Sequence, residues 1–195
     1  MMTGPFQAKD WVSRYLENDL PGRIVAFRNF WNMSEEELPL PNGYFNWAPP
    51  SLEHMGADLP VIYTVILTTN GMTRIGYTPE YDPIYRVEYA ARTYCWVKHV
   101  GIDMTVRSRD NLLTVMRTAI LDDQCLQAAD HENRDVKFDE GSVREEYSDI
   151  MFAKGDRYEA GGYLSYELTI NEVVSRPLIG TVEEFEVGTY AFLEE

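Results

Sequence analysis

The side chains best suited to chemistry are scattered along this chain rather than gathered in spaced motifs. The three histidines, His54, His99 and His131, each lack a second histidine or cysteine at the spacing that a metal site requires. Asp130, His131 and Glu132 are consecutive, but consecutive side chains point in different directions on a helix or a strand. We therefore interpret this segment as a solvated helix end and expect no metal site there.

The possible nucleophiles also lack partners. No serine lies in a G-x-S-x-G turn, and the AGGY stretch at 160–163 lacks the lysine and the following helix of a phosphate loop. His99 follows Cys95 by four residues, which on a strand is the same face but about 13 Å along it. We therefore interpret Cys95 and Cys125 as buried structural cysteines. The sequence names no catalytic residue, metal ligand or cofactor site, and we expect no enzymatic activity.

The composition is that of a globular domain with an acidic surface. Of the 195 residues, 45% are hydrophobic and 13% aromatic, which is enough for one domain with a core. The net charge of −15 argues against binding to nucleic acids and to anionic membranes, and with 32 acidic residues no carboxylate pair stands out from chance. Two cysteines, no signal peptide and no apolar run of about 20 residues predict a reducing compartment and no membrane span.

The first 60 residues are expected to form a helix, a strand and a long loop. Apolar residues recur at helical spacing from Pro5 to about Asn18, and proline suits a first helical turn. Leu-Pro-Gly at 20–22 is expected to end this helix, and residues 23–32, rich in β-branched and aromatic types, are expected to form a strand. Residues 34–59 contain four of the ten prolines, so we expect a long loop that is either functional or a surface insertion.

The middle of the chain predicts strands followed by an amphipathic helix. A strand is expected from Val61 to about Thr69, with Asn70-Gly71 as a hairpin turn. Residues 85–97 alternate between apolar and charged or aromatic types, which is typical of a half-exposed antiparallel strand. A helix is expected from Ser108, as its cap, to about Gln127, packed on that strand. The apolar stripe of this helix comprises Leu112, Leu113, Val115, Met116, Ala119 and Ile120.

The last third is more polar and then becomes apolar again. Residues 128–161 are acidic and contain two short strand patterns, 134–138 and 147–152, which we expect to form a hairpin. Alternation from Tyr163 to Val174 predicts a final strand. The residues after Arg176 are too apolar for a free tail and too few for a domain.

These elements predict an α+β fold, with a mainly antiparallel sheet and an amphipathic helix packed on one face. We expect one domain over residues 1–195, with insertions at about 34–59 and 128–161 and a C-terminal extension from about 176. Thirteen tyrosines favour contacts with partners, because tyrosine is common in interfaces. A binding or assembly protein is therefore favoured over an enzyme.

The order of the elements resembles the tail terminator, or tail completion, proteins of long-tailed bacteriophages. The stretches AKDWVSRYLENDL, YRVEYAARTYCWVKHVG, RDNLLTVMRTAILDD and YLSYELTINEVV carry the resemblance, which covers residues 5–174. Related neck proteins, which join the head to the tail, are similar at this level. A head–tail connector or other neck protein is therefore the alternative, followed by a non-viral binding module.

The resemblance implies a structural virion protein of the tail or neck, assembled in the host cytoplasm. Such proteins form a six-fold homo-oligomeric ring on the head-proximal end of the tail tube, where the ring stops polymerisation of the tube protein and meets the head–tail connector. Genomic DNA passes through the lumen without specific binding, and no membrane or cofactor takes part. An acidic lumen would suit that role, because contacts to phosphates would slow the DNA.

Overall fold

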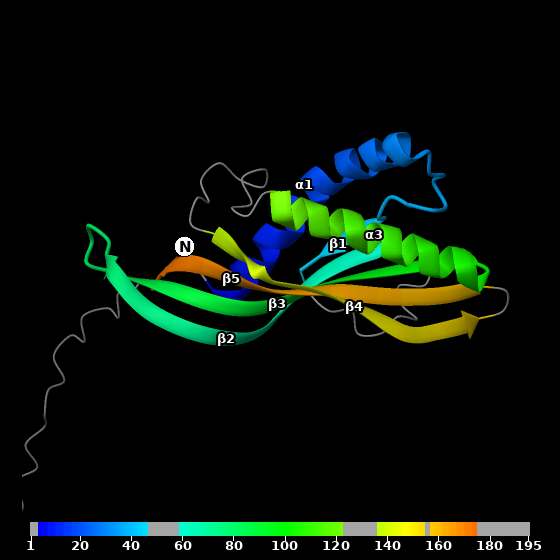
Figure 1. The fold of residues 1–195 in the computed structure, drawn as a ribbon. Coiled ribbons are helices and arrows are strands. Elements are labelled where there is room, and N and C mark those ends of the chain that lie inside the picture. Colours follow the sequence, from blue (N-terminus) through cyan, green and yellow to red (C-terminus); the bar gives the residue numbers. More distant parts are fainter. Residues whose placement is uncertain (1–3, 47–58, 123–135, 155–156, 175–195) are drawn as a thin grey trace, which may run out of the picture.

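The fold has two layers, a sheet and a pair of helices that lie on one of its faces (Figure 1). The computed structural model describes residues 4–46, 59–122, 136–154 and 157–174. Within these ranges there are two helices and one five-stranded mixed sheet in the order β1-β2-β3-β5-β4. The predicted α+β class is confirmed, while the single-domain organisation over 1–195 stays a prediction.

Helix α1, Pro5–Trp31, continues through Pro21, so the predicted helix end at Leu-Pro-Gly and the predicted strand at 23–32 are wrong. Proline inside a helix costs about 3 kcal/mol. Leu20 and Ile24 flank it on one face and are fully buried, and each contributes about 2 kcal/mol of apolar burial. Tertiary packing therefore overrides the local signals that favoured a break and a strand.

Helix α3, Ile102–Asp122, begins earlier than the predicted cap at Ser108. Ser108 instead lies buried inside the helix, where its hydroxyl is 3.2 Å from Nε2 of His99. The turn into the helix is made by Gly101, whose φ of 98° favours glycine. The predicted residues 123–127 lie outside the described ranges. The predicted apolar stripe is confirmed, since all six of its side chains are buried: Leu112, Leu113, Val115, Met116, Ala119 and Ile120.

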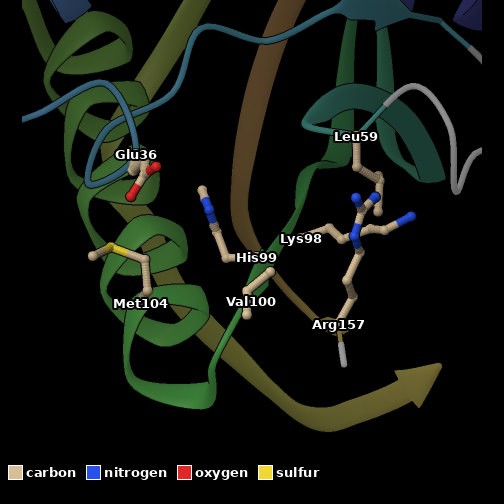
Figure 2. A pocket seen from close by; sticks show the side chains of 7 residues that line it. All are labelled: Glu36, Leu59, Lys98, His99, Val100, Met104 and Arg157. Carbon is tan, nitrogen blue, oxygen red and sulfur yellow. The ribbon is translucent and has the colours of Figure 1, made fainter. Parts of the chain in front are cut away.

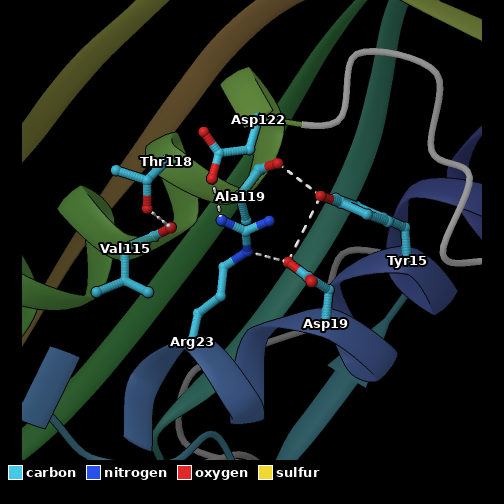
Figure 3. A network of polar contacts seen from close by, with 7 residues as sticks. All are labelled: Tyr15, Asp19, Arg23, Val115, Thr118, Ala119 and Asp122. Atoms are coloured by element: carbon cyan, nitrogen blue, oxygen red, sulfur yellow. Dashed lines mark hydrogen bonds and ion pairs between the residues drawn. The ribbon is translucent and has the colours of Figure 1, made fainter. Parts of the chain in front are cut away.

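A polar network joins the two helices to each other (Figure 3). The Tyr15 hydroxyl of α1 donates a hydrogen bond to the backbone carbonyl of Ala119 in α3, at 2.5 Å. Arg23 of α1 binds both Asp19 on its own helix and Asp122 on α3. This network, together with apolar contacts, fixes the second half of α1 over α3 rather than leaving it as a separate strand.

Strand β2, Val61–Tyr77, runs through the predicted Asn70-Gly71 turn, which is therefore wrong. The register with the next strand shifts at Asn70, which is an extra residue in a β-bulge. The chain reverses instead at 78–82, where Tyr81 has a φ of 65°. The local Asn-Gly signal failed because pairing with the neighbouring strand continues on both sides of it.

The centre of the sheet is formed by β3, Pro83–Val100, and β5, Arg157–Val173, which pair in antiparallel fashion over their whole lengths. Both strands are longer than predicted. The predicted alternation is confirmed, because the odd-numbered side chains of β3 from Val87 to Val97 are all buried. These side chains form the sheet side of the core, on which α3 packs against both strands.

The two edges of the sheet differ in length. Strand β4, Val136–Lys154, is one continuous strand paired with β5, so the predicted hairpin of 134–138 and 147–152 is wrong. Register shifts in β4 separate the two patterns that looked like independent strands. Strand β1, Gly43–Phe45, lies within the predicted loop 34–59 and pairs in parallel with the start of β2. The sheet is thus mainly antiparallel, as predicted, with one short parallel pair.

Candidate interaction surfaces

The residues that the sequence offered for chemistry do not form a constellation in the described part of the chain. His99 lies near the end of β3 and Cys95 in the core, while His54, His131 and Cys125 fall outside the described ranges. Among the residues that are described, no group of three or more His, Cys, Asp or Glu side chains could hold a metal ion. Within the same ranges, neither helix has the length and apolar character needed to cross a membrane.

The buried titratable groups of the core have structural partners. Burial raises the pKa of the Cys95 thiol to about 12, so the reactive thiolate is absent at neutral pH. The Tyr89 hydroxyl donates a hydrogen bond to Oε1 of buried Glu172, at 2.5 Å. Burial also raises the pKa of Tyr89 above its ordinary value. The Tyr89 hydroxyl and the Glu172 carboxylate therefore satisfy each other inside the protein.

A pocket of about 330 Å³ opens where β3 extends past the start of β2 (Figure 2). In Figure 2, Lys98 and Arg157 lie on the side of Leu59, and His99 points toward Glu36. Burial lowers the pKa of His99, so the imidazole is neutral at pH 7. The full lining is Glu36, Leu59, Lys98, His99, Val100, Met104 and Arg157.

The charges around this pocket nearly cancel. Lys98 Nζ lies 3.9 Å from a carboxylate oxygen of Glu159, and Glu36 adds an acid to the lining. His99 contacts the Ser108 hydroxyl at 3.2 Å and also faces Glu36, whose charge partly offsets the effect of burial on the His99 pKa. The pocket lining contains one acid, Glu36, and the hydroxyl beside His99 belongs to Ser108, which is buried inside α3 and does not line the pocket.

A row of tyrosines crosses the sheet face opposite the helices. Tyr63, Tyr94 and Tyr163 are in register on three neighbouring strands, with ring centroids 4.8 and 4.9 Å apart. The guanidinium carbon of Arg92 lies 4.6 Å from the Tyr163 ring, and the Tyr163 hydroxyl binds Glu146. Because the ring faces are occupied by one another, this row joins the strands rather than offering a flat platform for a ligand.

The first exposed apolar surface is the β2 arm, which we define as residues 67–77 of β2 with the turn at 78–82. In Figure 1 it extends to the left beyond both helices. In the part of the chain that the structure describes, β1 pairs only with 61–63, so the outer edge of the arm has no partner strand. Its large exposed side chains are Leu67, Met72, Ile75, Tyr77 and Tyr81. Such an edge is a site where another chain can add.

The second exposed apolar surface is the α1 aromatic end, which consists of Phe30 and Trp31. Their side chains are 80% and 61% exposed, and the two rings meet edge to face with centroids 5.0 Å apart. The end of the helix is fixed below them. Asn32 adopts the left-handed conformation with a φ of 52°, and Arg28 Nε donates a hydrogen bond to the carbonyl of Leu38, at 2.7 Å.

The sequence analysis did not single out either surface. It assigned the aromatic residues of 23–32 to a strand and ended the preceding helix too early. The spacing of Leu20, Ile24 and Phe27 was the available signal, because it continues the helical series and places Phe30 and Trp31 at a helix end. For the arm, the corresponding signal was the β-branched and aromatic residues that recur past Gly71, at Thr73, Ile75 and Tyr77.

Comparisons with known proteins leave the assignment to the residues and geometry described above. The chain matches no protein-family model and no curated protein sequence.

Proposed function

We propose that this protein is a tail terminator of a long-tailed bacteriophage. It forms a six-fold ring on the head-proximal end of the tail tube, ends polymerisation of the tube and joins the tail to the head connector. The observation that carries the proposal is the β2 arm, a long, bare and apolar extension of the sheet beyond the helix layer (Figure 1). The element order, which resembles tail terminators, supports it.

The distribution of exposed apolar side chains supports a protein that works by self-assembly. A monomeric protein rarely exposes several large apolar side chains together, and such groups mark contacts with partners. The β2 arm and the α1 aromatic end are two such places in the described chain, and they lie on different elements. It also has two unpaired sheet edges, one along β2 from residue 64 and one along β4, within the described ranges. Different surfaces on one chain favour head-to-tail contacts, which form a ring when the rotation between neighbouring copies closes.

The distribution of charged side chains indicates which surface would face the DNA. Among the residues whose side chains the structure describes, the open face of the sheet carries six cations and five acids by strand register: Arg86, Arg92, Lys98, Lys137, Arg144 and Arg157 against Glu88, Asp139, Glu146, Glu159 and Glu167. This face is therefore nearly balanced, although the whole chain has a net charge of −15. If the lumen repels DNA, as we propose, other parts of the chain line it.

The test is the length of the tail tube in the virus that encodes this chain. Without the protein, tubes should grow beyond their normal length, and adding the purified protein during tube growth should stop elongation. A head–tail connector would give a different result, since tubes of normal length would accumulate without heads. Tubes of normal length that carry heads, in the absence of the protein, would contradict both viral functions.

A further inference from the structure

We propose that neighbouring copies bind head to tail, with the β2 arm of one copy docked on the α1 aromatic end of the next. In this contact the arm of one copy inserts, and Phe30 and Trp31 of the next copy receive it. The inference deepens the proposed function, because it rests on a ring and names the contact that builds it. The contact itself is a property of the isolated protein and can be tested without a virus particle.

The arm is suited to insert because it is stiff and apolar. It is formed by paired strands, so its side chains are held at fixed positions rather than on a loose loop. Met72 and Tyr77 are 55% and 53% exposed, and Tyr81 at the turn is 83% exposed. Apolar side chains on a backbone that is already ordered bury area on docking at a low cost in conformational entropy.

The α1 aromatic end is suited to accept because its rings are presented on a fixed support. Phe27 and Met33, on either side of the pair, pack against the core. The hydrogen bond from Arg28 to the Leu38 carbonyl holds the following segment against the helix. Phe30 and Trp31 therefore project from a rigid helix end, and tryptophan and other aromatic residues in such positions carry much of the energy of protein interfaces.

The charges beside the two surfaces are complementary. Arg74 lies on the arm, with its guanidinium carbon 5.3 Å from the Tyr77 ring, and no ion pair of Arg74 occurs among the described residues. Glu35 and Glu36 come a few residues after the end of α1, with Glu35 paired to Arg28 and Glu36 at the edge of the pocket that contains His99. The turn of the arm carries Glu80, which would repel this acidic segment, so docking places Arg74 rather than the turn beside Glu35 and Glu36.

The occupant is a second copy because the two surfaces lie on opposite sides of the molecule. Figure 1 places the arm at the left and the C-terminal end of α1 at the upper right, so they cannot cover each other within one copy. A contact between two arms would leave the α1 aromatic end of each copy exposed. A repeated contact between arm and helix end covers both surfaces on every copy once the ring closes.

The test mixes two full-length variants, each defective on one surface. The arm variant carries Met72→Ser and Ile75→Ser, and the helix-end variant carries Phe30→Ser and Trp31→Ser. Analytical ultracentrifugation over a range of concentrations should show that the wild type associates and that each variant alone associates at least tenfold more weakly. An equimolar mixture should form heterodimers and nothing larger, because each pair retains one intact arm and one intact helix end. Phe6→Ser, an exposed aromatic substitution elsewhere on α1, is the matched control and should associate like the wild type.

Each other outcome overturns the inference. A wild type that stays monomeric at about 1 mM, close to the weakest affinities that binding assays resolve, shows no such contact. Unchanged assembly of the helix-end variant alone shows a contact between arms, and a mixture that stays monomeric shows that the two surfaces do not bind each other. Circular dichroism checks that the variants are folded. Trp31→Ala is a milder change at the helix end and should also weaken the association. None of these outcomes affects tail-tube length, which tests the proposed function separately.

Discussion

Strand β2 contains two regions that differ in what their apolar side chains do. In the first, Ile62 and Thr64 are buried beneath the helix layer, whereas from Leu67 onward the strand forms the bare arm. Both regions pair with the same neighbouring strand, β3, so backbone hydrogen bonding does not distinguish them. The comparison teaches that apolar residues stabilise the fold where the helices cover them and are available to a partner where the helices do not.

The largest effect should come from charging the covered region. Leu112→Asp places a carboxylate in the core between α3 and the sheet and should lower the free energy of unfolding by about 4 kcal/mol. Ile120→Asp should act similarly. Leu121→Asp, one residue on and 36% exposed, is the control and should cost much less. Denaturant unfolding measures all three, and an unchanged stability for Leu112→Asp would show that the helix does not pack as described.

Glycines in the two regions should respond differently to an added methyl group. A Cβ at Gly162 of β5 would lie 2.5 Å from a Leu113 side-chain atom and 3.2 Å from the Glu146 carbonyl oxygen. Gly162→Ala should therefore destabilise the protein by about 2 kcal/mol. At Gly76 in the arm a Cβ would meet nothing within 4 Å, so Gly76→Ala should be close to neutral. Thermal unfolding of the two variants compares them, and equal costs would contradict the division into covered and bare regions.

Polar substitution in the arm should leave the folded state almost unchanged. Met72→Ser removes an exposed side chain and should alter the free energy of unfolding by less than about 0.5 kcal/mol. Val87→Ser, at the cross-strand partner position but fully buried, should cost several times more. Chemical denaturation at low protein concentration keeps self-association out of the measurement. A large cost for Met72→Ser would mean that the arm is part of the core.

The smallest effect should be on the pH dependence of stability, through His99 near the end of β3. Burial lowers the pKa of His99 in the folded protein below its ordinary value of 6.5. At pH values between the folded-state pKa and 6.5, the unfolded chain therefore binds a proton that the folded protein does not. Stability should therefore fall as pH decreases from about 6.5 toward the folded-state pKa, and His99→Gln should remove this part of the pH dependence. Melting temperatures at pH 7 and pH 5 provide the comparison. The prediction fails if both proteins lose the same stability over that interval.

The sequence predicted the elements of the covered region well because their apolar residues recur at regular spacing. Alternation along 85–97 and the apolar stripe of α3 both reflect burial on one face, and the structure confirms both. It failed at Pro21 and at Asn70-Gly71, where strong local signals for a break and a turn are overridden by packing of α1 and by continued pairing of β2. Interaction surfaces were not predictable in the same way, because exposure of Phe30 and Trp31 depends on where the helix passes the edge of the core.

Imaging the neck of the assembled virus particle tests the central claim most directly. The account predicts six copies of this chain in a ring around the tail axis, on the head-proximal end of the tube. Within that ring, each β2 arm should contact the α1 aromatic end of the next copy. A particle without this chain, or one that carries it as a monomer away from the tail axis, would contradict the account.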